Sequence, residues 1–257
     1  MPTRFDLDGK IALVTGASSG LGARFARVLA DNGAEVVLAS RRVERLKELR
    51  AEIESTGGSA HVVALDVTDF ASIRDAVEQA ESQAGPIDIL VNNSGVSTTQ
   101  RLVDVAPEDF DFIFDTNTRG AFFVAQQVAR RMIARAQEDP KRQARIINIA
   151  SMAALRVLAQ IGVYCMSKAA VVQMTKAMAL EWGRYGINVN AVCPGYIETE
   201  INAEHWNTEA GQKLIRMLPR RRVGQPEDLD GLLVLLASER SGFINGAVIA
   251  ADDGFGV

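Results

Sequence analysis

Residues 11–22 read IALVTGASSGLG, a short apolar run that passes directly into a glycine-rich turn. The run is rich in aliphatic residues, as a strand covered on both faces is, and helical periodicity begins after the turn. Gly16, Gly20 and Gly22 form a G-x-x-x-G-x-G pattern there. Such glycines let the backbone approach a pyrophosphate, which the N-terminus of the following helix attracts. The segment predicts a dinucleotide-binding βα unit, and an ordinary tight turn is the alternative.

The same alternation of apolar runs and helical patterns continues along the chain. The further runs are EVVLAS (35–40), HVVAL (61–65), IDILVN (87–92), RIINIA (145–150), INVNAV (187–192) and AVIAAD (247–252). Helical patterns lie between them, at 22–33, 43–57, 70–85, 107–136, 162–183 and 226–238. Strand and helix in regular succession predict right-handed crossovers. We therefore expect an α/β, Rossmann-type doubly wound fold with a seven-stranded parallel sheet flanked by helices, as a single domain over residues 1–257.

Composition and charge exclude several classes of protein. The formal net charge is −4 and the isoelectric point is about 5.4, which argues against a broad nucleic-acid surface. The N-terminus mixes charges, and no apolar run approaches the roughly 18 residues of a membrane span. We expect a cytoplasmic protein that binds neither membranes nor nucleic acid and holds no metal. Cys165 and Cys193 lie in apolar surroundings and are expected to be free thiols rather than a disulfide.

The stretch YCMSK, residues 164–168, places a phenol and an ammonium four residues apart in an apolar helical pattern. Tyr164 and Lys168 would share one helix face, with Cβ atoms about 6 Å apart. A buried lysine is costly, so it needs a reason, and a cation there would bring the pKa of the phenol toward neutrality. The alternative is a phenol bonded to the backbone and a lysine that extends to the surface. Ser151 follows the run 145–150 and is either a substrate ligand at the sheet edge or a helix N-cap.

These segments occur together in an order typical of one family. TGASSGLG (15–22), LDV (65–67), NNSG (92–95), Asn117, Ser151, YCMSK and PGYIET (194–199) resemble the motifs of the short-chain dehydrogenase/reductase family, in particular its 3-oxoacyl reductase-like members. The resemblance spans residues 10–254. Two departures are NNSG where the family usually has NNAG, and DDGF near the C-terminus where it often has DGG.

The resemblance implies roles for individual residues. Tyr164 is the general acid/base, Ser151 orients the substrate oxygen, Lys168 also binds the nicotinamide ribose, and Asn117 holds a water in a proton relay. For Asn117 a helix kink or a bond to a carbonyl in the preceding turn is the alternative. Asp66 is implied to contact the adenine ring, and Asn92 to line the cofactor cleft. The cofactor-binding residues implied are Gly16, Ser18, Ser19, Gly20, Leu21, Ser40, Arg41, Asp66, Val67, Asn93, Gly95, Tyr164, Lys168, Pro194, Gly195, Ile197 and Thr199.

The end of the second run predicts which dinucleotide is bound. An acidic residue about 20 positions past the glycine turn selects NAD, but Ser40 stands there and Arg41 and Arg42 follow. A guanidinium binds phosphate in a bidentate fork, so we expect NADP(H) to be favoured over NAD(H), with Arg41 as the main determinant and Arg42 secondary. Ser19 occupies the place where some relatives carry a basic residue. Alternatively, both arginines are surface charges that pair with Glu44 and Glu48.

We therefore expect an oxidoreductase that transfers a hydride between a nicotinamide and a ketone or secondary alcohol, with reduction favoured. The alternatives are an NAD-dependent alcohol dehydrogenase of the same family and a non-catalytic dinucleotide-binding protein. The segment 195–218, with Tyr196, His205 and Trp206, is expected to be a substrate lid whose aromatic residues either close over the substrate or pack the lid onto the domain. Arg101 or Arg156 would meet an acidic substrate group or face water.

One more expectation concerns assembly. The helical pattern 162–183 carries apolar residues around more than one face, as a helix covered by both its own sheet and a second subunit does. We expect a homotetramer, as in relatives.

Overall fold

Each predicted apolar run forms a strand of one parallel sheet in the computed structural model, which describes residues 5–200 and 202–256. The strands are β1 (Ile11–Thr15), β2 (Glu35–Ser40), β3 (Ser59–Ala64), β4 (Ile89–Asn92), β5 (Ala144–Ile149), β6 (Ile187–Pro194) and β7 (Val248–Ala251). Their order in the sheet is β3-β2-β1-β4-β5-β6-β7, and every neighbouring pair is parallel. The expected doubly wound Rossmann-type fold is confirmed.

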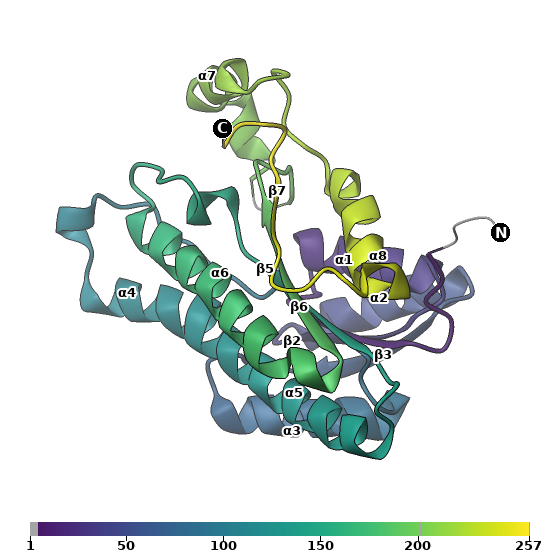
Figure 1. Cartoon of the computed structure of the whole chain (residues 1–257). Coiled ribbons are helices and arrows are strands. Elements are labelled where there is room, and N and C mark those ends of the chain that lie inside the picture. Colours follow the sequence, from purple (N-terminus) through teal and green to yellow (C-terminus); the bar gives the residue numbers. More distant parts are fainter. Residues whose placement is uncertain (1–4, 201, 257) are drawn as a thin grey trace.

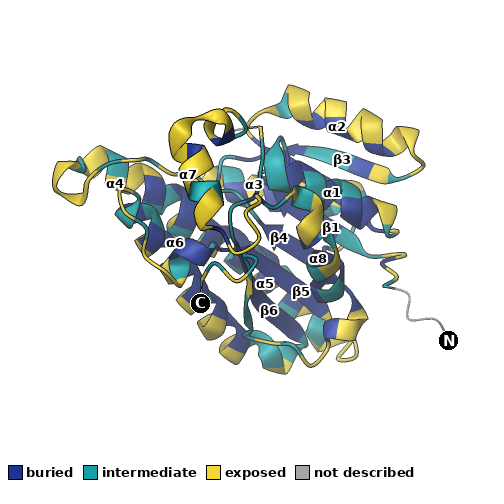
Figure 2. Cartoon of the chain, turned by 90° about the horizontal axis from the view of Figure 1, so that it is seen from above, coloured by how far each residue is buried: buried dark blue, intermediate teal, exposed yellow. Residues whose placement is uncertain are grey.

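Helices cover both faces of the sheet (Figure 1). On one side lie α1 (Gly20–Asp31), α2 (Val43–Ser55) and α8 (Asp230–Ala237), and on the other α3 (Phe70–Ala84), α5 (Ala121–Glu138) and α6 (Gly162–Trp182), with α4 (Pro107–Phe114) against α6. In β1, Ala12 and Val14 pack into the first core and Leu13 into the second. Because both faces are buried (Figure 2), the strands read as continuous apolar runs.

The predicted continuous helix over 107–136 is wrong in one respect. A π-helical segment, Asp115–Gly120, separates α4 from α5. At Gly120 a Cβ atom would lie 2.6 Å from the Val67 carbonyl oxygen, so this turn passes directly against the end of the β3–α3 connection. Such π segments inside helices often occur at functional sites. The helix α7 (Glu209–Met217) was not predicted as a helix and lies in the expected lid.

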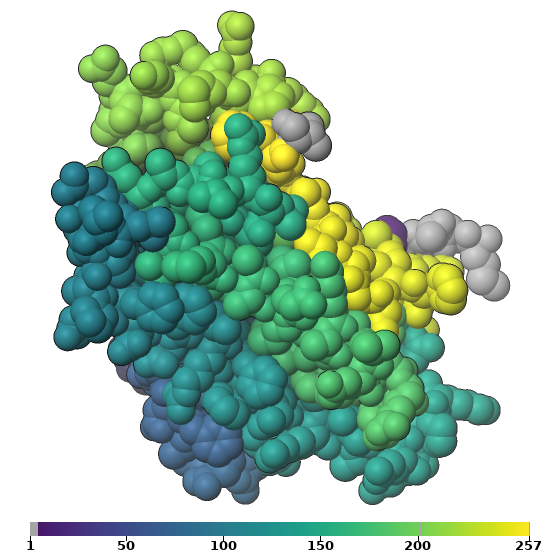
Figure 3. Space-filling view, turned by 60° about the vertical axis from the view of Figure 1, so that its left-hand side comes forward, coloured from purple at the N-terminus to yellow at the C-terminus, as the bar shows by residue number. Residues whose placement is uncertain are grey.

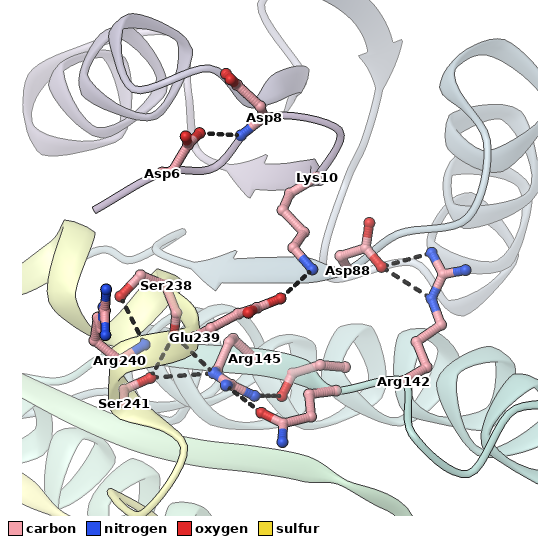
Figure 4. Close-up of polar contacts among 12 residues, drawn as sticks. Asp6, Asp8, Lys10, Asp88, Arg142, Arg145, Ser238, Glu239, Arg240 and Ser241 are labelled. Atoms are coloured by element: carbon pink, nitrogen blue, oxygen red, sulfur yellow. Dashed lines mark hydrogen bonds and ion pairs between the residues drawn. The ribbon is translucent and has the colours of Figure 1, made fainter. Parts of the chain in front are cut away.

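A buried arginine joins β5 to the turn after α8 at the amino-terminal edge of the sheet (Figure 4). Arg145 is 3% exposed and donates hydrogen bonds to the Ser238 carbonyl (3.2 Å), the Ser241 hydroxyl (3.1 Å) and the Gln143 side-chain carbonyl (2.8 Å). Burial lowers the pKa of its guanidinium. Nearby, Arg142 pairs with buried Asp88 at 2.6 Å. Polar side chains thus hold the amino-terminal edge of the sheet to the turn after α8.

Two further predictions concern the chain as a whole. Cys165 and Cys193 are both buried and free, as expected. Within residues 5–200 and 202–256, every helix is too short or too polar to cross a membrane.

Candidate active site

The glycine turn and the start of the β4–α4 connection meet at the carboxyl end of the sheet. Gly16 has a φ of +67°, and a Cβ atom at Gly22 would lie 2.3 Å from the Gly16 carbonyl oxygen, so both positions require glycine. Asn93 joins the two segments, because its backbone N–H donates to the Thr15 hydroxyl (3.0 Å) and its amide to the Thr15 carbonyl (3.1 Å). The strand order diverges between β1 and β4, the place where ligands of open α/β sheets bind.

A cleft of ≈ 400 Å³ opens at this point, and we call it the glycine-turn cleft. It is lined by Gly16, Ser18, Ser19, Gly20, Leu21, Ser40, Arg41, Arg42, Leu65, Asp66, Val67, Thr68, Asn93, Ser94, Gly95, Val96, Thr116 and Thr199. Ser19 is the N-cap of α1 but its side chain makes no capping bond, which leaves N–H groups of the first turn available to an anion. A phosphate-bearing ligand fits this combination of close backbone and positive charge.

A second cavity of ≈ 480 Å³, the tyrosine pocket, adjoins the first and shares Leu21, Asn93, Gly95, Val96 and Thr199 with it. Its other lining residues are Ser97, Phe112, Ile149, Ala150, Ser151, Tyr164, Lys168, Pro194, Gly195, Ile197 and Asn202. Every predicted catalytic or cofactor-binding residue therefore lines one of the two cavities, except Asn117 and Asn92. The prediction that Asn92 lines the cleft is wrong. Its amide points inward and donates to the Ala121 carbonyl (2.7 Å) and Asn148 (3.2 Å).

Ser151, Tyr164 and Lys168 converge in the tyrosine pocket. Ser151 lies two residues past the end of β5, and its hydroxyl accepts a hydrogen bond from the Ala153 N–H at 3.1 Å, so it also caps a short turn. Lys168 is 4% exposed, and its ammonium donates to the Ile149 carbonyl at 2.8 Å and lies 5.8 Å from the centre of the Tyr164 ring. The alternative of a lysine that extends to the surface is excluded. Burial lowers the pKa of Lys168 to about 8.

The pKa of Tyr164 moves in the opposite direction from the one expected. Burial raises it, and the neighbouring Ser151 side chain only partly offsets that effect. The Lys168 ammonium donates to the Ile149 carbonyl and lies over the Tyr164 ring, 5.8 Å from its centre. In the protein alone, burial therefore favours the protonated phenol of Tyr164.

Asn117 lies behind the pocket, on the π-helical segment. Its carbonyl oxygen accepts from the Val96 N–H (2.8 Å), and its amide donates to the Val96 carbonyl (2.8 Å) and the Ser167 hydroxyl (3.0 Å). The residue thus fixes the loop after β4 to α6. The irregular backbone of this segment agrees with the alternative of a distorted helix rather than with an uninterrupted one.

Arg42 makes a contact that the sequence did not predict. Its guanidinium donates to the hydroxyls of Ser18 (3.1 Å) and Ser19 (2.5 Å), while its backbone N–H donates to the Ser40 hydroxyl (3.1 Å). A positive charge therefore stands beside Ser19, where the turn itself has no basic residue. The contact could have been predicted from the adjacency of β1 and β2, because the residues that follow the carboxyl ends of neighbouring parallel strands lie close together.

The alternative role of Arg41 and Arg42, as partners of acidic residues on α2, finds no support. Glu44 pairs with Lys47 at 2.8 Å, and within the described residues no ion pair joins either arginine to Glu44 or Glu48. Asp66 is near Arg41. Although burial acts to raise the pKa of Asp66, hydrogen bonds from Thr68 and the charge of Arg41 lower it below its ordinary value.

The lid is held down by an aromatic cluster. Trp206 is 6% exposed, lies edge-on to Tyr196 with ring centres 5.8 Å apart, and donates from its indole to Asn202 at 3.2 Å. Phe255 of the C-terminal segment also lies edge-on to Tyr196, with ring centres 5.6 Å apart. These contacts favour the interpretation that the aromatic residues pack the lid onto the domain. Figure 3 shows the C-terminal segment, in yellow, against the light-green lid.

Comparison with known proteins gives consistent matches over the whole chain. The family model described as "Enoyl-(Acyl carrier protein) reductase" matches residues 16–256. Gluconate 5-dehydrogenase of Gluconobacter oxydans is 40% identical over 100% of this chain and 98% of its own, and an NAD-dependent glycerol dehydrogenase of Listeria innocua is 34% identical over 98% and 95%. A solved structure of a gluconate 5-dehydrogenase from Burkholderia cenocepacia, in complex with NADP and tartrate, has a TM-score of 0.92 and 38% identity over 98% and 97% of the two chains.

Proposed function

Since the chain belongs to the short-chain dehydrogenase/reductase family and is an oxidoreductase that acts on CH–OH groups with a nicotinamide dinucleotide, we propose that it prefers NADP(H) and uses Tyr164 as its acid/base group. The single observation that carries this proposal is the convergence of Ser151, Tyr164 and Lys168 in a pocket that adjoins the glycine-turn cleft. A protein that only binds a dinucleotide needs none of these three side chains.

The residues around the pocket support a division of roles. The bound nicotinamide supplies or accepts the hydride. In reduction, Tyr164 gives its phenolic proton to the carbonyl oxygen as the carbon becomes an alcohol carbon, and Ser151 orients that oxygen by a hydrogen bond. Lys168 holds a positive charge close to the phenolate that remains, which favours proton release. A phenol with a raised pKa is protonated at neutral pH, as a proton donor must be.

The cofactor preference rests on the charge around Ser40. The cleft carries two guanidiniums, Arg41 and Arg42, and a serine in place of the carboxylate that would accept ribose hydroxyls and repel a phosphate. Asp66, the acidic residue that lines the cleft, already accepts two hydrogen bonds from Thr68. The NADP held by the Burkholderia protein agrees with this proposal, whereas the NAD-dependent glycerol dehydrogenase shows that relatives differ.

We propose a polyhydroxylated ketone or alcohol as the substrate. The relatives are named for gluconate and glycerol. The tyrosine pocket offers the hydroxyls of Ser97 and Thr199, which line it together with Ser151 and Tyr164, to hydroxyls of a substrate.

A direct test uses the purified protein, NADPH or NADH, and a panel of ketones, with loss of absorbance of the reduced nicotinamide as the readout. The panel contains 5-keto-D-gluconate, D-fructose, dihydroxyacetone, cyclohexanone and acetoacetyl thioester. We expect turnover of the polyhydroxylated ketones with NADPH. Turnover of the thioester alone would contradict the proposed substrate class, and no turnover of any ketone would contradict the proposed activity.

Assembly as a homotetramer also remains a proposal. Apolar side chains stay exposed on three neighbouring helices: Phe110 on α4, Phe122 on α5, and Met166 and Leu180 on α6. Large exposed apolar groups clustered on one part of a surface are typical of a subunit contact.

A further inference from the structure

The C-terminal segment, residues 252–256, leaves β7 and turns back against the lid (Figure 1). Asp252 closes this turn, because its carbonyl accepts a hydrogen bond from the Phe255 N–H at 3.1 Å. Its carboxylate accepts from the backbone N–H groups of Gly254 (3.1 Å) and Gly256 (2.9 Å). These bonds fix the path of the segment and hold the Phe255 side chain half-buried.

Asp253, in the DDGF stretch that departs from the family pattern DGG, joins the C-terminal segment to the end of the lid. Its φ of +59° lies in the left-handed region, which favours glycine and which aspartate also adopts. Its carboxylate pairs with Arg220, two residues past the lid, at 2.7 Å. An aspartate here therefore keeps the glycine-like turn of the backbone and adds a contact that glycine cannot make.

The Phe255 ring contacts the lid side of the tyrosine pocket through a short chain of side chains. It lies edge-on to Tyr196, with ring centres 5.6 Å apart, and Tyr196 lies edge-on to Trp206 at 5.8 Å. The Trp206 indole donates to the Asn202 side-chain carbonyl at 3.2 Å, and Asn202 lines the tyrosine pocket. The position of this wall of the pocket therefore depends on the support that Phe255 gives to the aromatic residues of the lid.

Phe255 also contacts the loop that carries Ser151. Its backbone carbonyl accepts from Arg156 Nη1 at 2.5 Å, and the Arg156 guanidinium lies 4.8 Å from the centre of its ring. The Arg156 backbone N–H donates in turn to the Met152 carbonyl at 2.9 Å, in the turn that Ser151 begins. The exposed guanidinium is thus directed at the C-terminal segment.

Two apolar clusters meet at Phe255. One contains Met152 and is also contacted by Tyr164, and the other is the lid cluster around Trp206. In the part of the chain that the structure describes, Phe255 is the one residue that packs against both clusters. Its ring therefore joins the two opposite walls of the tyrosine pocket.

We infer that Phe255 is a positioning residue, which holds the lid wall of the tyrosine pocket at a fixed distance from the wall that carries Ser151 and Tyr164. Without the ring the lid can move outward, so the pocket widens and a substrate loses contacts on one side. Phe255 touches no reacting atom, so the proton donor stays in place. The effect on kinetics rests on the proposed function, whereas the effect on the lid does not.

The fluorescence of Trp206 reports the position of the lid without turnover. The chain has a second tryptophan, Trp182, so every variant is made in a Trp182→Phe background. Trp206 is 6% exposed, and we expect Phe255→Ala to raise its acrylamide quenching constant by about twofold or more, because the lid opens more often. Phe243→Ala is the matched control, since it removes the same group from an exposed position outside both clusters.

The kinetic test uses NADPH and the polyhydroxylated ketone that the panel above shows to be turned over fastest. We expect Phe255→Ala to raise KM by roughly threefold to tenfold, while the single-turnover rate at saturating ketone changes by less than about twofold. Phe255→Leu keeps apolar volume without the ring, so it should recover part of the loss in both measurements. Phe243→Ala should match the parent protein.

Equal quenching of Trp206 in Phe255→Ala and in the parent protein overturns the inference. An equal rise in quenching for Phe243→Ala does the same, because the effect would not depend on the junction of the two clusters. A lower single-turnover rate with KM unchanged also overturns it, since the ring would then act on the chemical step. Where Phe255→Ala does not fold, Phe255→Leu takes its place in each comparison. Absence of turnover on every ketone would contradict the proposed function, and the quenching comparison would still decide the inference.

Discussion

The ammonium of Lys168 lies 5.8 Å from the centre of the Tyr164 ring, one helical turn away, and is held inside the protein by the Ile149 carbonyl. Such a position is unfavourable for a cation, and burial lowers its pKa to about 8. A lysine kept there at a cost in stability is typical of a functional site rather than of a packing site.

The first prediction is that the stability lost by burying the Lys168 ammonium varies with pH. Lys168 has a pKa of about 8 in the folded protein against 10.5 for an ordinary lysine, so between these values the unfolded state binds more protons. The free energy of unfolding contributed by this group therefore rises with pH from about 8 to 10.5. Lys168→Met has no group at this position that can bind a proton, so its stability lacks this dependence on pH. The difference in stability between Lys168→Met and the unmodified protein, measured by urea unfolding, should shift in favour of the unmodified protein over this range.

Lys176→Met provides the matched control, because Lys176 is exposed on the same helix. Its stability difference from the unmodified protein should stay nearly constant between pH 7 and about 10.5. A Lys168→Met difference that is equally constant would show that the buried ammonium is not desolvated in solution.

The second prediction concerns the proton donor. Tyr164→Phe removes only the hydroxyl, so turnover should fall by on the order of 10²–10⁴ while cofactor affinity changes little. Stopped-flow measurement of the chemical step, together with fluorescence titration of the reduced cofactor, separates the two effects. Retention of more than about a third of the unmodified turnover would mean that another group donates the proton.

Much of the fold was predictable because parallel strands buried on both faces appear as uninterrupted apolar runs. The π-helical segment at Asp115–Gly120 was not, since it arises where Gly120 meets the Val67 carbonyl, a contact between segments distant in sequence. The helix α7 was not predicted for a different reason. It has only nine residues, which are too few turns for a helical period to stand out in the sequence.

The residues that line the two cavities were predictable because the glycines, Tyr164 and Lys168 stand at fixed spacings, whereas contacts between separate loops were missed. Arg42 reaches Ser19 only because β1 and β2 are adjacent. Asn92 and Asn93 cannot be distinguished by spacing alone, and successive residues of an extended chain face opposite ways. The direction of the Tyr164 pKa depends on how completely the ring is buried, which no local motif encodes.

The third prediction tests the buried arginine at the opposite edge of the sheet. Arg145→Met should lower the free energy of unfolding by about 1–3 kcal/mol, because the carbonyls of Ser238 and Ala144 and the Ser241 hydroxyl lose a charged donor inside the protein. Arg240→Met, a change at an exposed residue of the same turn, should cost less than about 0.5 kcal/mol. Urea unfolding of the two variants gives the comparison, and equal losses would show that the Arg145 contacts contribute little.

The fourth prediction is a homotetramer in solution. Three large apolar side chains stay partly exposed in a single chain: Phe110 (38%), Phe122 (38%) and Met166 (46%). Contact with a second copy of the chain would cover them. Light scattering at micromolar concentration should give about four times the chain mass of 27.8 kDa. Phe122→Glu should reduce that mass by placing charge in the contact. A mass near 28 kDa for the unmodified protein would contradict the prediction.

The last prediction concerns which dinucleotide is bound. Ser40→Asp with Arg41→Ala places a carboxylate at the end of β2 and removes one of the two cations that line the cleft. The change should weaken NADPH binding and strengthen NADH binding, since a carboxylate accepts ribose hydroxyls and repels a phosphate. Each tenfold change in a dissociation constant corresponds to about 1.4 kcal/mol. Arg42→Ala should also weaken NADPH binding, because its guanidinium is fixed beside Ser19.

Arg45→Ala is the control for these variants, as Arg45 lies on α2 and pairs with Glu200 at 3.0 Å. It removes the same charge from the first turn of α2, just after Arg41 and Arg42, without removing a group that lines the cleft, so both dissociation constants should stay within about twofold of the unmodified values. If Arg45→Ala weakened NADPH binding as much as Arg41→Ala or Arg42→Ala, the effect would come from the overall field of α2 rather than from phosphate contacts. Equal or tighter binding of NADH by the unmodified protein would show that Ser40, Arg41 and Arg42 do not select the phosphate at all.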